Sequence, residues 1–160
     1  LLINDVMPNL ELNREFKIEW ASKEFLYKEA DLITLHVPLT QNTKNMIGAK
    51  ELSMMKPNAM LINTSRGGII NELDLYNCLV KNHLGGVAID VFENEPYNGP
   101  LSKIDKCLLT AHMGSMSIDC RTRMEIEATE ETIRFKNGLP LLSEVPESEY
   151  KVQSLFSQER

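Results

Sequence analysis

The sequence of 160 residues has little of several features that mark large classes of proteins. Its three cysteines, Cys78, Cys107 and Cys120, are odd in number and far apart, so we expect reduced, buried thiols rather than disulfides or a metal site. The longest apolar runs have the length of a strand, and none is long enough to span a bilayer. No basic segment followed by an apolar one marks a secretion signal. From these absences we expect a cytoplasmic protein that does not contact a membrane.

Positive charge is also scarce. The formal net charge is −6, and no cluster of lysine and arginine stands out. A chain of this kind lacks the electrostatic footprint of a nucleic-acid-binding protein. The hydrophobic content of 42% is sufficient for one buried core. We therefore expect one globular domain without a nucleic-acid partner.

Strand-like and helix-like segments alternate over most of the chain. The pattern predicts strands at residues 1–4, 31–37, 59–64, 87–92 and 107–112. It predicts helices from Ser22 to about residue 30, at 49–55, from Asn71 to a left-handed turn at Gly85-Gly86, and from Ser117 to 137. No element is predicted between residues 7 and 20. This alternation is typical of parallel βαβ units, so the expected class is α/β.

The stretch Asn58-Ala-Met-Leu-Ile-Asn-Thr-Ser-Arg-Gly-Gly-Ile-Ile-Asn71 is central to the interpretation. Its apolar start predicts a strand buried on both faces, and the two glycines predict a turn with positive φ or a close backbone approach. Arg66 then lies at the carboxyl end of a strand, where open α/β sheets bind ligands. Its guanidinium can hold a carboxylate through two parallel hydrogen bonds. The alternative is an ordinary strand exit with a solvated arginine.

Polar residues follow the other predicted strands at the same edge of the sheet. They are Asp5, His36, Asp90, Glu95 and His112. A carboxylate such as Asp5 at a strand end can accept hydrogen bonds from ribose hydroxyls and would favour NAD over NADP. Glu95 could bind one ring nitrogen of His112 and leave the other as a proton donor or acceptor. The alternatives are a polar strand end, a structural or cofactor-lining His36, a loop carboxylate at Glu95 and a core histidine at 112.

Four motifs in order resemble the NAD-binding domain of the D-isomer-specific 2-hydroxyacid dehydrogenases. They are Leu35-His-Val-Pro-Leu-Thr40, Met55 to Gly68, Gly86-Val-Ala-Ile-Asp-Val-Phe-Glu-Asn-Glu-Pro96 and Ala111-His-Met-Gly-Ser115. The resemblance implies an oxidoreductase in which Arg66 orients the substrate, Glu95 pairs with the histidine, and His112 is the acid/base. It implies that Asp5 binds the ribose of NAD, and that further residues line the NAD site: His36, Pro38, Thr64, Asp90 and Gly114. The implied substrate is a small 2-hydroxy or 2-oxo acid, and no metal is implied.

The sequence departs from this family in two ways. Ala111 replaces the usual proline before the histidine, and no Gly-x-Gly-x-x-Gly motif is present. The expected fold is therefore an incomplete doubly wound parallel sheet, Rossmann-like, without its first strand and without the separate substrate domain. Residues 1–140 would form a partial NAD-binding domain and 141–160 a C-terminal tail. We expect a vacancy in the sheet, with the strands at 1–4 and 31–37 on one side and the strand at 59–64 on the other.

Three functional interpretations follow. The chain is the C-terminal part of an NAD-dependent D-2-hydroxyacid dehydrogenase, which is the interpretation that we favour. It is alternatively a non-catalytic remnant that acts as a binding or oligomerisation module through an exposed strand edge. In the third interpretation, a partner chain or a second copy completes the sheet and the enzyme. The sequence does not specify which 2-hydroxy acid would be used.

Overall fold

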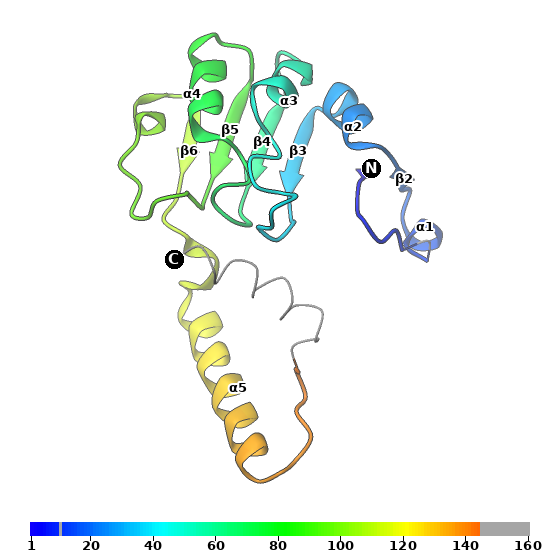
Figure 1. Ribbon diagram of the computed structural model, residues 1–160, viewed down its shortest axis with the longest axis vertical. Helices are drawn as coiled ribbons and strands as arrows, with labels where there is room; N and C mark the ends of the chain where they lie inside the picture. The colour runs from blue at the N-terminus through cyan, green and yellow to red at the C-terminus, as the bar shows by residue number, and fades with distance from the viewer. Residues whose placement is uncertain (10, 145–160) are drawn as a thin grey trace. The chain divides into compact units, whose positions relative to one another are not determined.

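The structure is a computed structural model, and it describes residues 1–9 and 11–144. It contains two compact units, Leu1–His112 and a second unit that begins at Met113. In the first unit, four parallel strands form a sheet in the order β3 (Leu32–Leu35), β4 (Met60–Asn63), β5 (Gly86–Ile89) and β6 (Cys107–Leu109) (Figure 1). The predicted α/β class with a parallel sheet is confirmed.

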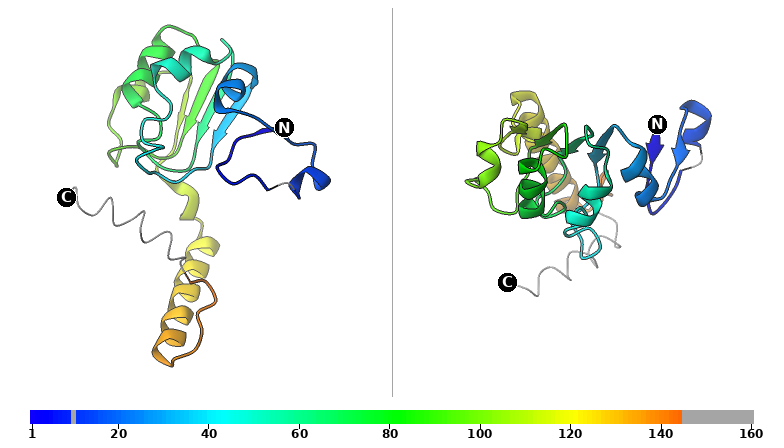
Figure 2. Two further views of the ribbon diagram at one scale, coloured as in Figure 1. Left: turned by 45° about the vertical axis from the view of Figure 1, so that its right-hand side comes forward. Right: turned by 90° about the horizontal axis from the view of Figure 1, so that it is seen from above.

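One face of this sheet carries the hydrophobic core. Ile33 pairs in register with Leu61, which pairs with Val87, and all three side chains are buried. Helices α2 (Lys23–Glu29), α3 (Ala49–Met54) and α4 (Glu72–Val80) lie on this side (Figure 2). On the opposite face Met60 is 49% exposed, so the expectation of a strand buried on both faces is wrong.

Side-chain caps begin the helices where the sequence predicted them. The Ser22 hydroxyl accepts a hydrogen bond from the Phe25 amide at 3.2 Å, and the Asn71 side chain accepts one from the Asp74 amide at 3.0 Å. Both contacts satisfy amides that have no partner within the helix. The predicted end of α4 is wrong, because the left-handed residue after Val80 is Asn82, with φ of 56°, and neither Gly85 nor Gly86 has positive φ.

The N-terminal segment forms a second, two-stranded sheet. β1 (Leu2–Ile3) pairs in parallel with β2 (Glu19–Trp20), and α1 (Leu12–Glu15) lies between them in the chain. The sequence analysis missed α1 and β2, because elements of four and two residues carry no measurable periodicity.

The predicted position of the vacancy is wrong. Because β3 pairs directly with β4, nothing separates residues 31–37 from 59–64. Instead, a cavity of about 650 Å³ is lined by the β1 segment, α2 and β3, and we call it the β1–β3 cavity. Within the described residues no strand pairs with the second edge of β1 or of β3. The discontinuity therefore lies between the two-stranded and the four-stranded sheet.

The remaining elements are η1 (Pro100–Lys103) in the first unit and η2 (Met113–Ser115) and α5 (Ile118–Lys136) in the second. The Ser117 hydroxyl caps α5 by accepting a hydrogen bond from the Cys120 amide at 3.2 Å. Across residues 1–9 and 11–144, no helix combines the length and the apolar character needed to cross a bilayer. The predicted division at residue 140 stays a prediction, since residues 145–160 of the tail lie outside the described part of the chain.

Candidate active site

The Arg66 loop follows β4 directly and is held against the next loop by its glycines. A Cβ at Gly67 would lie 2.0 Å from the carbonyl oxygen of Phe92, so only glycine allows this contact. Gly68 has φ of +78°, a value that side chains disfavour. Both predicted roles of the glycine pair, close approach and positive φ, are thus present in one turn. The turn brings Arg66 to the carboxyl end of the sheet beside the loop that carries Glu95.

Glu95 joins two parts of this edge. Its Oε1 accepts a hydrogen bond from the Phe92 amide at 3.0 Å, and its Oε2 lies 3.0 Å from Nδ1 of His112. Phe92 itself stacks on Tyr97, with ring centroids 4.1 Å apart, which holds the start and the end of the Glu95 loop together. The sequence-based pairing of Glu95 with His112 is therefore present in the structure as a direct hydrogen bond.

These contacts determine which ring nitrogen of His112 carries the proton. The Phe92 amide, and then the hydrogen bond with His112, lower the pKa of the Glu95 carboxyl below its ordinary value. The carboxyl is thus ionised at neutral pH and can only accept, so Nδ1 of His112 is the donor. Nε2 is therefore the ring nitrogen that is not bonded to Glu95. Half of the His112 side chain, 49%, is exposed, so a ligand can reach this nitrogen.

The backbone of His112 is held as well. Its amide donates to the carbonyl oxygen of Asp90 at 2.8 Å, and its φ is +53°. A left-handed conformation is uncommon for a residue with a side chain, and such residues occur often at functional sites. The conformation turns the chain sharply after β6 at the edge of the sheet where Arg66 and Glu95 lie.

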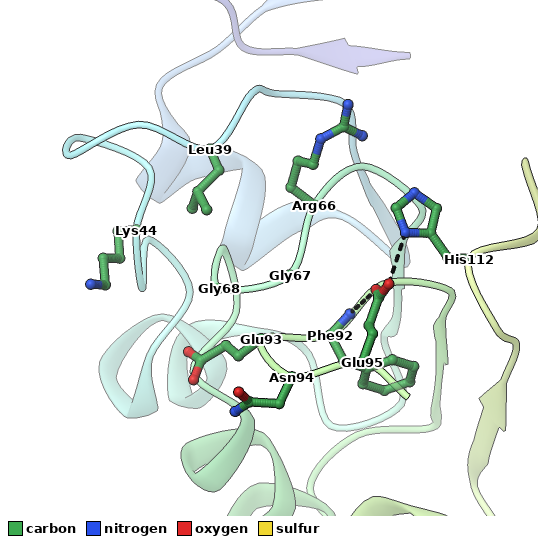
Figure 3. A pocket seen from close by; sticks show the side chains of 10 residues that line it. All are labelled: Leu39, Lys44, Arg66, Gly67, Gly68, Phe92, Glu93, Asn94, Glu95 and His112. Carbon is green, nitrogen blue, oxygen red and sulfur yellow. Dashed lines mark hydrogen bonds and ion pairs between the residues drawn. The ribbon is translucent and has the colours of Figure 1, made fainter. Parts of the chain in front are cut away.

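Arg66, Glu95 and His112 line one cavity of about 550 Å³, which we call the Arg66 cavity. Its lining is shown in Figure 3 and consists of Leu39, Lys44, Arg66, Gly67, Gly68, Phe92, Glu93, Asn94, Glu95 and His112. Among the described residues, Arg66 makes no ion pair, and its Nη1 donates to the carbonyl oxygen of Ser65 at 2.6 Å. The cavity thus combines an unpaired guanidinium with an imidazole oriented by a carboxylate.

The β1–β3 cavity holds two other predicted residues, Asp5 and His36. Asp5 follows β1, and its Oδ1 accepts a hydrogen bond from the Met7 amide at 2.8 Å. A hydrogen bond of 2.9 Å joins His36 Nε2 to the Thr34 hydroxyl. Most of the remaining lining is apolar, and it includes Leu2, Leu26 and Ile33. An acidic group in the lining of a mostly apolar cavity is suited to a ligand with a flat apolar ring and hydroxyl groups.

The other predicted residues are spread more widely. Pro38 and Thr64 are exposed and line neither cavity. Asp90 is only 8% exposed, and its carboxylate accepts a hydrogen bond from the Thr110 hydroxyl. Gly114 belongs to η2 in the second unit. Their assignment to a cofactor site remains a prediction.

Sequence reasoning missed one residue that the site depends on. Asn63, the last residue of β4, is 2% exposed and bonds to both Ser65 and Arg66. The sequence signal that could have identified Asn63 is its position as a polar residue at the end of an apolar run. No group of three or more metal-ligating side chains occurs in residues 1–9 and 11–144.

Comparison with known proteins gives one family. Residues 2–114 match the model of the D-isomer specific 2-hydroxyacid dehydrogenase, NAD binding domain. The chain is 43% identical over 129 residues to a glyoxylate reductase from Thermococcus litoralis, and covers 39% of that protein with 80% of its own length. It is 36% identical over 147 residues to D-3-phosphoglycerate dehydrogenase from Escherichia coli, with 88% of this chain and 35% of that protein covered.

The fold comparison agrees. The crystal structure of D-lactate dehydrogenase with NAD+ from Lactobacillus jensenii matches with a TM-score of 0.80 at 26% identity, covering 91% of this chain and 48% of that one. The chain thus spans less than half the length of these relatives. The match to the family model confirms the prediction of NAD as the cofactor. Together with the geometry of its strand ends, it establishes that this chain belongs to the D-isomer specific 2-hydroxyacid dehydrogenase family, through that family's NAD-binding domain.

Proposed function

We propose that this chain carries the catalytic side chains of an NAD-dependent D-2-hydroxyacid dehydrogenase. The observation that carries the proposal is the 3.0 Å hydrogen bond between Glu95 and His112 at the wall of a cavity that Arg66 also lines. A carboxylate, an oriented imidazole and an unpaired guanidinium are the groups that interconversion of a 2-oxo acid and a 2-hydroxy acid requires.

Each side chain has a distinct task in this proposal. Arg66 binds the substrate carboxylate through two parallel hydrogen bonds and so fixes the position of the neighbouring carbonyl carbon. His112 gives the proton on Nε2 to the carbonyl oxygen during reduction, and takes a proton from the hydroxyl during oxidation. Glu95 accepts the hydrogen bond from Nδ1 and so holds the imidazole in one tautomer and one orientation. When bound, NADH would supply the hydride for reduction, and NAD⁺ would accept it in oxidation.

The residues of this chain fit parts of NAD. The β1–β3 cavity, about 650 Å³, has the size of a typical ligand site, and Asp5 and His36 at its wall suit an adenosine with its ribose hydroxyls. Pro38, Thr64, Asp90 and Gly114 would line the remainder of the NAD site. For the pyrophosphate, the 160 residues contain no Gly-x-Gly-x-x-Gly turn. We therefore expect weaker NAD binding to this chain than to a complete dinucleotide site.

The decisive experiment measures binding and turnover with the full chain. NAD binding is measured by calorimetry, and NADH oxidation is then followed with glyoxylate, hydroxypyruvate and pyruvate. We expect measurable NAD binding and a slow turnover. Arg66→Lys should mainly raise the KM for the 2-oxo acid, since lysine keeps the positive charge but cannot form the two parallel hydrogen bonds of a guanidinium. NAD affinity no higher than that of an unrelated acidic protein would refute the proposal for this chain.

A second function, that of a non-catalytic binding or oligomerisation module, is favoured by a different observation. In the described residues, the second edges of β1 and β3 are unpaired, and an apolar cavity lies between them. Open strand edges pair readily with another strand. Pairing at these edges would produce a homo-oligomer or a complex with a partner chain that completes the sheet. Turnover near that of a complete dehydrogenase would exclude the non-catalytic alternative. A cytoplasmic location stays a prediction.

A further inference from the structure

Asn63 is one of two polar or charged residues that are buried in the described part of the chain, and the other is Asp90. It ends β4, its side chain is 2% exposed, and its hydrogen-bonding groups face the Arg66 loop. Burial of an amide without hydrogen-bond partners destabilises a fold, so the Asn63 side chain is expected to bond to its surroundings.

Both the nitrogen and the oxygen of its side-chain amide bond to that loop. The Nδ2 of Asn63 donates to the backbone carbonyl oxygen of Arg66 at 2.9 Å. Its Oδ1 accepts from the Ser65 amide at 3.1 Å and from the Ser65 hydroxyl at 2.8 Å. We propose that Asn63 is the positioning residue that holds Arg66 in the orientation needed to bind the substrate carboxylate. This inference deepens the proposed function and rests on it.

The same residue is linked to His112 through the sheet. The backbone carbonyl oxygen of Asn63 accepts from the Asp90 amide at 2.9 Å, and the Asp90 carbonyl oxygen accepts from the His112 amide at 2.8 Å. Hydrogen bonds therefore run from the Arg66 carbonyl through Asn63 and Asp90 to the backbone of His112. Because β4 and β5 are joined by backbone hydrogen bonds at this point, the spacing between the Arg66 guanidinium and the His112 imidazole depends on how Asn63 holds its loop.

A merely structural asparagine would behave differently from a positioning one. Loss of a structural contact lowers stability and weakens all ligands together. Loss of a positioning contact weakens the carboxylate ligand of Arg66 and leaves the binding of NAD unchanged. The two roles are therefore distinguished by comparing two ligands on one variant.

The test uses Asn63→Asp in the full chain. Aspartate has nearly the same shape and keeps the acceptor for Ser65, but it cannot donate to the Arg66 carbonyl oxygen. The matched control is Asn71→Asp, which makes the same chemical change at the cap of α4, where aspartate accepts the Asp74 amide equally well. The probe is oxamate, a non-reducible isostere of pyruvate, titrated in the presence of NADH. Order in residues 65–68 is measured by backbone amide NMR relaxation.

For Asn63→Asp we expect about tenfold weaker oxamate binding, unchanged NAD affinity and increased motion in residues 65–68. The control should match the wild type in all three measurements. Equal losses for oxamate and NAD, or a loop as rigid as in the wild type, would overturn the proposal. If the aspartate variant does not fold, Asn63→Ser decides by the same criteria, because serine is tolerated by size but cannot reach the Arg66 carbonyl. If the wild type binds no oxamate, the proposed function fails, and the loop motion alone decides the role of Asn63.

Discussion

The Arg66 cavity and the β1–β3 cavity have similar volumes, about 550 and 650 Å³, but the side chains proposed to bind ligands in them are held in different ways. In the Arg66 cavity, contacts cross between loops: Glu95 bonds to His112, and Gly67 packs against the backbone of Phe92. In the β1–β3 cavity, Asp5 bonds to Met7 and His36 to Thr34, and both contacts are local in the sequence.

The difference concerns how much of each site this chain can organise by itself. Long-range contacts fix the relative positions of groups that come from separate strands, whereas local contacts fix only the shape of one turn. The corner proposed for proton transfer is thus assembled within residues 1–112, while the corner proposed for adenosine is only outlined. The following predictions test this contrast, beginning with the largest expected effect.

Removal of the acid/base group should have the largest effect. For His112→Ala we expect the rate of NADH oxidation with glyoxylate to fall by about 10²–10⁴-fold, because the proposed mechanism takes the proton from His112. His83→Ala is the matched control, since His83 lies outside both cavities and bonds to the Met55 carbonyl oxygen. Steady-state kinetics measures both variants. A full rate in His112→Ala would remove His112 from the mechanism.

Gly67→Ala tests the packing that joins the two loops of the Arg66 cavity. An added Cβ would overlap the Phe92 backbone at 2.0 Å, and we expect the free energy of unfolding to fall by about 3 kcal/mol. In the control Gly48→Ala, the nearest atom is the Asp74 carboxylate oxygen at 3.3 Å, a side-chain atom that needs to shift only slightly, so the expected loss is below about 1 kcal/mol. Urea unfolding measures both. Equal losses would mean that the loop relaxes freely, and the contrast between the cavities would fail.

Asp5→Asn tests the β1–β3 cavity. If the carboxylate binds ribose hydroxyls, we expect about tenfold weaker NAD binding and a smaller preference for NAD over NADP. Asp31→Asn is the matched control, because Asp31 lines the same cavity but pairs with Lys56 at 3.0 Å at the surface. Calorimetry with NAD and with NADP gives the loss of NAD affinity and the ratio of the two affinities for each variant. An unchanged preference for NAD over NADP in Asp5→Asn would mean that Asp5 is only a polar residue at a strand end and does not bind the ribose.

The smallest effect concerns two glutamates near the Arg66 cavity. Hydrogen bonds from the Phe92 amide and His112 lower the pKa of Glu95, so its contribution to stability is present above the ordinary value of about 4.3 and is lost as the pH falls through the lowered pKa. Burial raises the pKa of Glu72, which has the opposite effect on stability. NMR titration of the two carboxyl carbons should give midpoints on either side of the ordinary value. A midpoint for Glu95 at or above that value would contradict the proposed ion pair.

Much of the local structure could be predicted, because its signals lie close together in the chain. Ser22, Asn71 and Ser117 each cap a helix at the predicted residue. The glycines after Arg66 have the predicted close approach and positive φ. The family motifs likewise extend over short stretches, and their order led to the family that the comparisons confirm.

The sequence by itself therefore determined the strands and helix caps of the parallel sheet, the Arg66 turn and the family, since each depends on neighbouring residues. Only the tertiary structure decided what depends on distant pairing: β2, the direct contact of β3 with β4, and the burial of Asn63. The hydrogen bond between Glu95 and His112 belongs to both groups. Its partners could be named from their strand ends, but the 3.0 Å contact exists because the Glu95 loop folds back onto the Phe92 amide.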